Sequence, residues 1–411
     1  MSARQNLCLS IGLFLCFTLC LFMVLIILDR PVNQYQLEKV IILSRHNLRT
    51  PLSKDLDKIT PLSWPKWKEE PGYLTEKGFV LEGYMGSFFK YWLNSNDLLL
   101  NGCPKKDEFY IYSNNMQRTL MSSKAFITKA FPGCEITIHQ SAKKYDPVFS
   151  PFIHNNTDNF RKIAIEEMDS VLESLNLKSA YNFMENILDY QTSELCKIDK
   201  KCDMITEKNL INITVGNKPS LKGPIKLCNM AIDAFFMEYY SGLPIHDIAW
   251  GKLSDMTDWN QILPLTYGYH NVTFNTTHVA KDIAKPLLKY LSNLFIQNYP
   301  TVTLLMGHDA NINVLLNAME FKPFMLKNEF VPTPIGGKIV FQKWQDLNNK
   351  KFLLKIEYVY QSMEQIRKGI VLSKNNPPMF QLLELKNCKA DDDGFCDWDE
   401  FLNFLHSIVL L

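Results

Sequence analysis

Three short runs rich in consecutive apolar residues, at 39–43, 108–112 and 301–306, give the strongest strand signals in the chain. Near-continuous apolarity over about five residues is typical of parallel strands that are covered on both faces. Each run is followed by a polar turn and then by residues with helical spacing, at 118–131 after the second run and at 311–319 after the third. This alternation predicts an α/β fold with a mostly parallel central sheet flanked by helices.

Other patterns extend this arrangement. Thr75 is a suitable N-cap for a helix whose apolar residues recur at 3.6-residue spacing. The segments 336–342 and 352–360 predict a hairpin that extends the sheet. Residues 158–190 predict two helices joined near Asn176.

The chain therefore divides into two predicted domains after its N-terminal segment. A mainly helical domain of residues 151–263 interrupts the α/β domain, which comprises residues 31–150 and 264–411. Ligands of open parallel sheets lie beyond the carboxyl ends of the strands. We expect the smaller domain to cover a crevice at that edge.

The N-terminal segment differs from the rest. Residues 7–28 carry no charge, follow Arg4 and precede Asp29. About 20 apolar residues suffice to cross a bilayer, so we interpret residues 1–30 as an export signal or a membrane anchor. A cleavable signal has a shorter apolar core of about 7–15 residues. We therefore favour an uncleaved anchor with the body of the protein outside the cytoplasm; cleavage is the alternative.

Composition narrows the class of protein. The 411 residues are 46% hydrophobic, which excludes a disordered chain, and 44 Lys and Arg against 43 Asp and Glu give a net charge of +1. Without a basic excess, nucleic acid is not an expected partner.

The ten cysteines also indicate export. Outside the apolar segment, their spacing favours disulfides in an oxidising compartment, between Cys103 and Cys134, Cys196 and Cys202, and Cys388 and Cys396. Cys228 is left over. Structural zinc is the weaker alternative, because no CxxC pair occurs.

The first predicted strand delivers Arg45, His46 and Arg49 within one turn of chain. Guanidinium groups bind phosphate oxygens and keep their charge, and an imidazole among such cations is biased towards its neutral, nucleophilic form. The strands that follow deliver Arg118 and the pair His308–Asp309 to the same expected crevice. An attacking imidazole, a guanidinium cage and a carboxylic acid are the parts needed for phosphoryl transfer to and from histidine.

These motifs, R-H-x-x-R-x-P near the N-terminus and H-D near the C-terminus, resemble those of the histidine acid phosphatases, a branch of the phosphoglycerate-mutase-like superfamily. Within that family the chain looks most like the bacterial periplasmic glucose-1-phosphatases, through segments at 44–49, 131–134, 307–309, 333–342 and 355–361. The resemblance implies that His46 becomes the phosphohistidine and Asp309 is the proton donor, with no metal or cofactor at either step. It also implies paired cysteines, and phosphoryl oxygens held by Arg45, Arg49, Arg118 and His308.

One position departs from the glucose-1-phosphatase pattern. Lys218 stands where that branch has a glutamate that contacts substrate. We expect Lys218 to face the mouth of the crevice, where a cation leaves room for substrates more anionic than glucose 1-phosphate. Sugar phosphates and inositol phosphates are therefore both candidate substrates.

Other interpretations stay open from sequence alone. A phosphoglycerate-mutase-like phosphotransferase would share the nucleophile, and a phosphate-ester binding protein would share the cage without turnover. Trp250 and Tyr239–Tyr240 could line a sugar site, although packing is the favoured interpretation. The remaining histidines have no comparable context, and we interpret them as surface or hydrogen-bonded core residues: His139, His154, His246, His270, His278 and His406.

Overall fold

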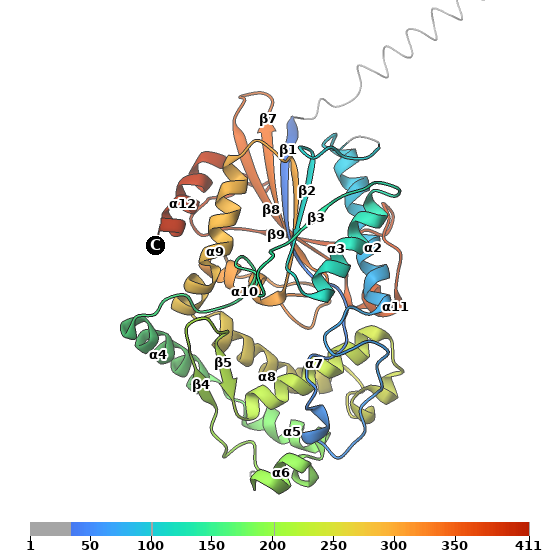
Figure 1. The fold of residues 1–411 in the computed structure, drawn as a ribbon, viewed down its shortest axis with the longest axis vertical. Coiled ribbons are helices and arrows are strands. Elements are labelled where there is room, and N and C mark those ends of the chain that lie inside the picture. Colours follow the sequence, from blue (N-terminus) through green and yellow to red (C-terminus); the bar gives the residue numbers. More distant parts are fainter. Residues whose placement is uncertain (1–33, 100–101, 201, 411) are drawn as a thin grey trace, which may run out of the picture.

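The computed structural model describes residues 34–99, 102–200 and 202–410, and its centre is an eight-stranded mixed sheet with the order β10-β8-β7-β1-β6-β2-β3 and β9 beside β8 (Figure 1). Strands β1, β6, β2 and β3 are parallel, whereas β7 to β10 are antiparallel to their neighbours. The predicted α/β class and the hairpin are thus confirmed, and the hairpin makes the sheet mixed. The strands are β1 (Tyr35–Arg45), β2 (Phe109–Ser113), β3 (Ile138–His139), β6 (Val302–Gly307), β7 (Lys338–Asp346), β8 (Phe352–Tyr360), β9 (Met379–Leu383) and β10 (Cys396–Asp397).

Helices cover both faces of this sheet (Figure 1). Along β1, Ile41 and Leu43 belong to one apolar core, and Val40 and Ile42 belong to the other. Alternate side chains point to opposite faces of a strand, so the near-continuous apolarity reflects burial on both sides. The covering helices are α2 (Glu76–Ser95) and α3 (Gln117–Ala130) on one face, and α9 (Thr277–Ile296), α10 (Asp309–Ala318) and α12 (Trp398–Leu410) on the other; α11 (Met363–Lys368) follows β8.

A second, mainly helical part lies beyond the carboxyl ends of the parallel strands (Figure 1). Its first two helices match the pair predicted on either side of Asn176, and α8 runs across the predicted boundary at residue 263. The division into domains stays a prediction. The elements of this part are α4 (Asp158–Ser174), α5 (Lys178–Leu188), α6 (Glu194–Asp199), α7 (Pro224–Ser241), α8 (Met256–Phe274), the hairpin β4 (Leu210–Asn212) and β5 (Ser220–Lys222), and the 3₁₀ turns η1 (Leu56–Lys58), η2 (Tyr190–Thr192) and η3 (Ile245–Gly251).

Helix α2 is pressed against the chain that follows β1. Its predicted N-cap is confirmed, because the Thr75 hydroxyl accepts the Gly78 N–H at 3.0 Å. A Cβ atom on Gly78 would lie 2.1 Å from the Leu48 carbonyl oxygen, and one on Gly86 would lie 2.3 Å from that of Phe126. Only glycine permits this approach, so α2 can support the turn after β1 directly.

Three disulfides join the predicted cysteine pairs, Cys103–Cys134, Cys196–Cys202 and Cys388–Cys396, and Cys228 is buried and free. Such bonds fit an oxidising compartment. The predicted signal or anchor at residues 1–30 lies outside the described residues. Among the helices that are described, none has the length and apolarity needed to span a bilayer.

Candidate active site

Three strand ends meet at one edge of the sheet, with β6 between β1 and β2. The His46 N–H donates to the Gly307 carbonyl at 3.0 Å, and the Asn114 N–H donates to the Met306 carbonyl at 3.0 Å. These bonds bring the turn after β1, the start of α3 and the start of α10 together. The predicted convergence of polar residues after the three apolar runs follows from this strand order.

Three arginines meet at this edge, and each has a buried donor that is unused. Arg45 and Arg49 are 6% and 3% exposed, and the Nε atoms of Arg45, Arg49 and Arg118 are all buried without a hydrogen-bond partner in the described chain. Burial, with a contribution from Arg49, lowers the pKa of Arg118 to about 10. Unsatisfied buried donors are costly, and three cationic ones form a strong site for an oxyanion.

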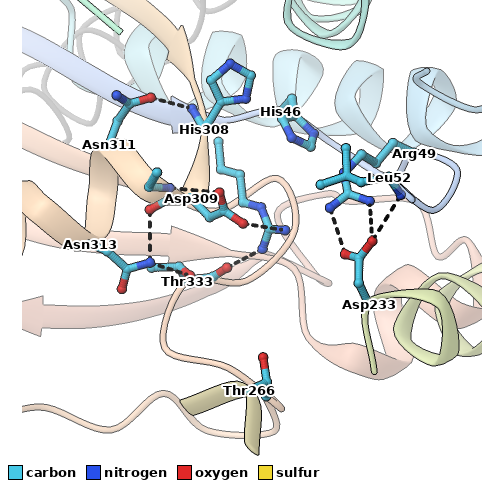
Figure 2. Close-up of polar contacts among 12 residues, drawn as sticks. His46, Arg49, Leu52, Asp233, Thr266, His308, Asp309, Asn311, Asn313 and Thr333 are labelled. Carbon is cyan, nitrogen blue, oxygen red and sulfur yellow. Dashed lines mark hydrogen bonds and ion pairs between the residues drawn. The ribbon is translucent and has the colours of Figure 1, made fainter. Parts of the chain in front are cut away.

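Asp233, which sequence analysis did not single out, holds Arg49. Its carboxylate accepts from both Nη atoms of Arg49 at 2.9 and 2.7 Å and from the Leu52 N–H at 3.2 Å. Figure 2 shows the dashed contacts that join Asp233 to Arg49 and Leu52. Asp233 lies in α7 between the buried residues Ile232 and Ala234. A carboxylate in such an apolar stretch was the available signal, but Glu238 shares the helix, and nothing in the pattern revealed that Asp233 pairs with Arg49.

His46 is oriented as a nucleophile. Its Nδ1 lies 2.8 Å from the Asn47 carbonyl oxygen, an acceptor only, so Nδ1 carries the proton. Nε2 makes no hydrogen bond within the described part of the chain and keeps its lone pair. Burial lowers the pKa of the imidazole well below its usual value, and Arg118, His308 and Arg45 lower it further. The ring is therefore neutral.

A buried ion pair fixes the turn that carries His46. Lys338 and Glu82 are both fully buried and meet at 2.8 Å. The same ammonium donates to the Ser44 hydroxyl at 2.8 Å, and the other Glu82 oxygen accepts from the Asn47 amide at 3.0 Å. We call Ser44, Asn47, Glu82 and Lys338 the buried clamp; it links β1, α2 and β7 around the nucleophile.

Asp309 and His308 occupy the start of α10. Burial raises the pKa of the Asp309 carboxyl, but Arg45 at 3.3 Å, with a further contribution from Arg49, outweighs burial and holds this pKa well below its usual value. Asp309 is therefore ionised in the unliganded site. The His308 Nε2 lies 3.1 Å from the Asn114 side-chain oxygen, which already accepts the Met116 N–H. His308 therefore donates from Nε2, and only Nδ1 is left for a ligand.

Lys218 interacts electrostatically with Asp309, Arg118 and Arg49. The residue is exposed, and its Nζ lies 4.8 Å from the centroid of the Phe274 ring. Desolvation of the ammonium lowers its pKa, with Arg118 adding to the effect and Asp309 opposing it. Lys218 is thus within electrostatic reach of the predicted chemistry.

Two sequence interpretations have different outcomes. Trp250 packs against Trp64 and Phe235, and its N–H donates to the Ser63 carbonyl at 2.9 Å, so its contacts are those of packing.

His270 was interpreted as a surface or hydrogen-bonded core residue. That was wrong, because neither ring nitrogen is hydrogen-bonded to a described residue and Nδ1 is buried. Sequence spacing could not reveal this, since the partners of α8 come from distant segments.

No cluster of three or more His, Cys, Asp or Glu suited to a metal ion occurs among residues 34–99, 102–200 and 202–410. The groups at the site are instead suited to hold an oxyanion and to transfer it to an imidazole.

Comparison with known proteins gives the same picture. The histidine phosphatase superfamily (branch 2) matches residues 36–360. Glucose-1-phosphatases of Providencia rettgeri and Salmonella typhimurium are 40% identical over 375 and 382 residues, covering 89% and 91% of this chain and 90% and 92% of theirs. The Hafnia alvei phytase in complex with myo-inositol hexakis sulphate superposes with a TM-score of 0.82 at 27% identity, over 92% of this chain and 98% of that one. The resemblance inferred from the motifs is confirmed.

The buried clamp yields a stability prediction. Lys338→Met leaves the Glu82 carboxylate buried and unpaired, so we expect the free energy of unfolding to fall by about 3–5 kcal/mol. Lys322→Met, which breaks a half-exposed pair with Glu384, should cost under about 1 kcal/mol. Urea unfolding measures both.

The double variant Lys338→Met/Glu82→Leu separates stability from activity. Replacing a buried pair by apolar side chains is often neutral, so stability should largely return while activity stays low, because Asn47 has lost its partner. Full activity in this double variant would contradict a role for the clamp in positioning His46.

Proposed function

Because the chain belongs to branch 2 of the histidine phosphatase superfamily and is a histidine acid phosphatase similar to glucose-1-phosphatases and phytases, we propose that it hydrolyses phosphate monoesters of sugars or polyols through a phosphohistidine at His46. The observation that carries this proposal is the free Nε2 of a neutral, buried imidazole among three guanidinium groups with unused donors. The phosphoryl group would take up those donors.

In the first half-reaction, the His46 Nε2 lone pair forms an N–P bond as the ester P–O bond breaks. The electron pair of that bond leaves with the ester oxygen, which takes a proton from Asp309. The Nε donors of Arg45, Arg49 and Arg118 hold the equatorial oxygens as charge accumulates on them. Burial and then Arg118 lower the pKa of His308 well below its usual value, so the ring is neutral and its free Nδ1 accepts from a protonated phosphoryl oxygen of the bound monoanion.

In the second half-reaction, Asp309 is a carboxylate and accepts a proton from water. The water oxygen bonds to phosphorus, the N–P bond breaks, and its electron pair returns to Nε2. The neutral imidazole is restored, and the proton on Asp309 leaves with the product as phosphate monoanion, which returns Asp309 to the carboxylate. Asp309 thus serves as acid and then as base, and each step balances without a further reactant.

The proton that Asp309 donates must come from outside the empty site, because Asp309 is ionised there. The carboxyl is ionised, so the proton arrives with the substrate as a phosphate monoanion, whose second pKa is about 6. Once the phosphate binds, its charge raises the pKa of the adjacent carboxyl, and its oxygens compete for Arg45. Both effects move the proton to Asp309 before the ester bond breaks.

A bell-shaped pH profile follows. kcat/KM should decline above about pH 6 as the monoanion disappears, and should decline on the acid side only below the usual carboxyl pKa of 3.8, because Arg45 keeps Asp309 ionised. Glycerol 2-phosphate hydrolysis between pH 3 and 9 measures both limbs. A maximum at alkaline pH would overturn the assignment of Asp309.

The covalent intermediate is the most direct test. Acid-labile phosphate should appear on His46 when the enzyme is mixed with p-nitrophenyl phosphate in EDTA and quenched during turnover. His46→Ala should lose both the adduct and at least about 10³-fold of kcat, whereas the exposed His406→Ala should keep both. Turnover at saturation without an adduct would reject the proposal.

The same experiment tests the alternatives. A phosphotransferase would move the phosphoryl group to an added alcohol in preference to water, so the ratio of free phosphate to released phenol would fall well below one. A binding protein would bind phosphate esters and release no phenol.

Lys218 supports a preference for anionic leaving groups. Its ammonium interacts electrostatically with Asp309 and Arg118, and in this proposal it adds positive charge where the leaving group binds. Inositol phosphates carry further phosphates that such a cation attracts, whereas glucose carries none. Sugar phosphates and inositol phosphates are both proposed substrates. We expect Lys218 to raise kcat/KM more for inositol phosphates than for sugar phosphates.

Reversing this charge should reverse the preference. Lys218→Glu should move the ratio of kcat/KM for glucose 1-phosphate to that for phytate by about tenfold towards glucose 1-phosphate, with less effect at high salt. Lys222→Glu, an exposed charge reversal in the same hairpin, is the matched control. An unchanged ratio in Lys218→Glu would refute this role.

We also propose that the protein acts outside the cytoplasm, held to the membrane by residues 7–28. The disulfides and the uncharged apolar segment support this location. Fractionation and N-terminal sequencing of the exported protein test whether the segment is kept.

A further inference from the structure

The loop between α10 and β7 is attached to the helical part of the molecule at Phe330. This residue is 1% exposed, and its ring packs among aromatic rings of α7 and α8. Its carbonyl accepts the Tyr267 hydroxyl of α8, and the preceding Glu329 carboxylate accepts the Tyr240 hydroxyl of α7 at 3.2 Å. The loop is therefore fixed to both helices at this point. The rings around Phe330, at centroid distances of 4.6, 5.1, 5.3 and 6.0 Å, belong to Trp259, Tyr239, Phe236 and Tyr240.

Three residues later the same loop contacts Arg45. The Thr333 carbonyl accepts from the Arg45 Nη1 at 2.5 Å, and the Arg45 Nη2 pairs with Asp309 at 3.3 Å. The loop then continues along the strand end, where the Gly336 N–H donates to the His46 carbonyl at 3.2 Å. A guanidinium group is planar and rigid. The contacts of the two Nη atoms therefore also set the direction of Nε, which has no partner among the described residues.

The chain between these two contacts is stiff. It reads Val331-Pro332-Thr333-Pro334, and each proline fixes its own φ and restricts the residue before it to extended conformations. Three residues also span at most about 11 Å when fully extended. A displacement of Phe330 is therefore passed on to Thr333, because the short segment between them has little freedom to absorb it.

Helix α7 thus supports two of the three arginines of the site. Its Asp233 holds Arg49 directly through both Nη atoms. Together with α8, it also holds Phe330, and through the stiff segment it determines where the Thr333 carbonyl meets Arg45. The packing of the helical part is in this way connected to the guanidinium groups at the edge of the sheet.

Resting on the proposed function of the site, we propose that Phe330 is a positioning residue for oxyanion binding, which sets the guanidinium of Arg45 through the Thr333 carbonyl. Phe330 contacts no substrate in this role. Its packing keeps Thr333 in place, and Arg45 then presents its unused Nε to a phosphoryl oxygen. Loss of the ring should weaken the binding of the anion without removing any group that touches it.

Inorganic phosphate, the product of the proposed reaction, tests the role of Phe330 without requiring turnover. Phe330→Ala in the full chain should raise the Kd for phosphate by about five- to tenfold, the effect expected when one hydrogen bond to the anion is weakened. Phe330→Leu, which keeps an apolar side chain, should raise it by about threefold. Isothermal titration calorimetry at about pH 5, where phosphate is a monoanion, measures both.

Phe401→Ala is the matched control. It removes a fully buried ring of α12 that contacts Phe295 and Trp398, away from the loop and from the site. This variant should lower the urea midpoint about as much as Phe330→Ala and leave the Kd for phosphate unchanged. An equal rise in Kd for Phe401→Ala would mean that general loosening explains the effect, and the inference would be overturned.

A double-mutant cycle tests the route through Arg45. In an Arg45→Met background, Phe330→Ala should change the Kd by less than about twofold, because the group that it positions is gone. In an Arg118→Met background its full effect should remain, since Arg118 makes its contact with the Gly72 carbonyl, at 3.5 Å, and none with this loop is present among the described residues. If Phe330→Ala does not fold, Phe330→Leu is used in the same cycle.

The remaining outcomes also decide the proposal. An unchanged Kd in the Phe330 variants would overturn the inference, and so would an effect of the same size in both arginine backgrounds. If wild type binds no phosphate and forms no adduct on His46, the proposed function fails instead. The two failures are therefore distinguishable.

Discussion

The site depends on one buried ion pair, between Lys338 and Glu82. Neither charge reaches water, so each is tolerated only because the other is held at hydrogen-bond distance. Through Ser44 and Asn47 the pair reaches both sides of the Arg45–His46 peptide. The position of the nucleophile is therefore set by a contact among three elements, β1, α2 and β7, which are far apart in the chain.

Carboxylates pair with some of the guanidinium donors at the site and leave others unused. Asp233 takes both Nη atoms of Arg49, and Asp309 pairs with Arg45, whereas all three Nε donors are unused. The carboxylates fix two guanidinium groups without consuming their capacity for an oxyanion. Under the proposed function, a phosphate ester would meet donors that are already oriented, which reduces the reorganisation needed during reaction.

Much of the fold was predictable because its signals are local. The apolar runs that became β1, β2 and β6, the cap at Thr75 and the helix pair around Asn176 each depend on neighbouring residues. The catalytic candidates were also predictable, since Arg45, His46 and Asp309 lie directly at strand ends. Parallel strands bring such ends to one edge.

The rest could not be predicted, because it depends on pairs that are distant in sequence. Asp233 meets Arg49 across 184 positions, and Lys338 meets Glu82 across 256. His270 lies in an ordinary helical pattern, and its unpaired ring follows from the packing of α8 against other elements. Sequence also suggests a carboxylic acid at Asp309, whereas its ion pair with Arg45 makes it a carboxylate in the unliganded site.

The direction of β1 has a practical consequence. The strand starts at Tyr35 and delivers its chemistry only at its other end, at Arg45, 10 residues later, which is about 33 Å away at the rise of an extended strand. Anything joined to the chain ahead of Tyr35, whether a lipid-embedded tether, an affinity tag or a fusion partner, is thus attached at the end of β1 opposite to the site.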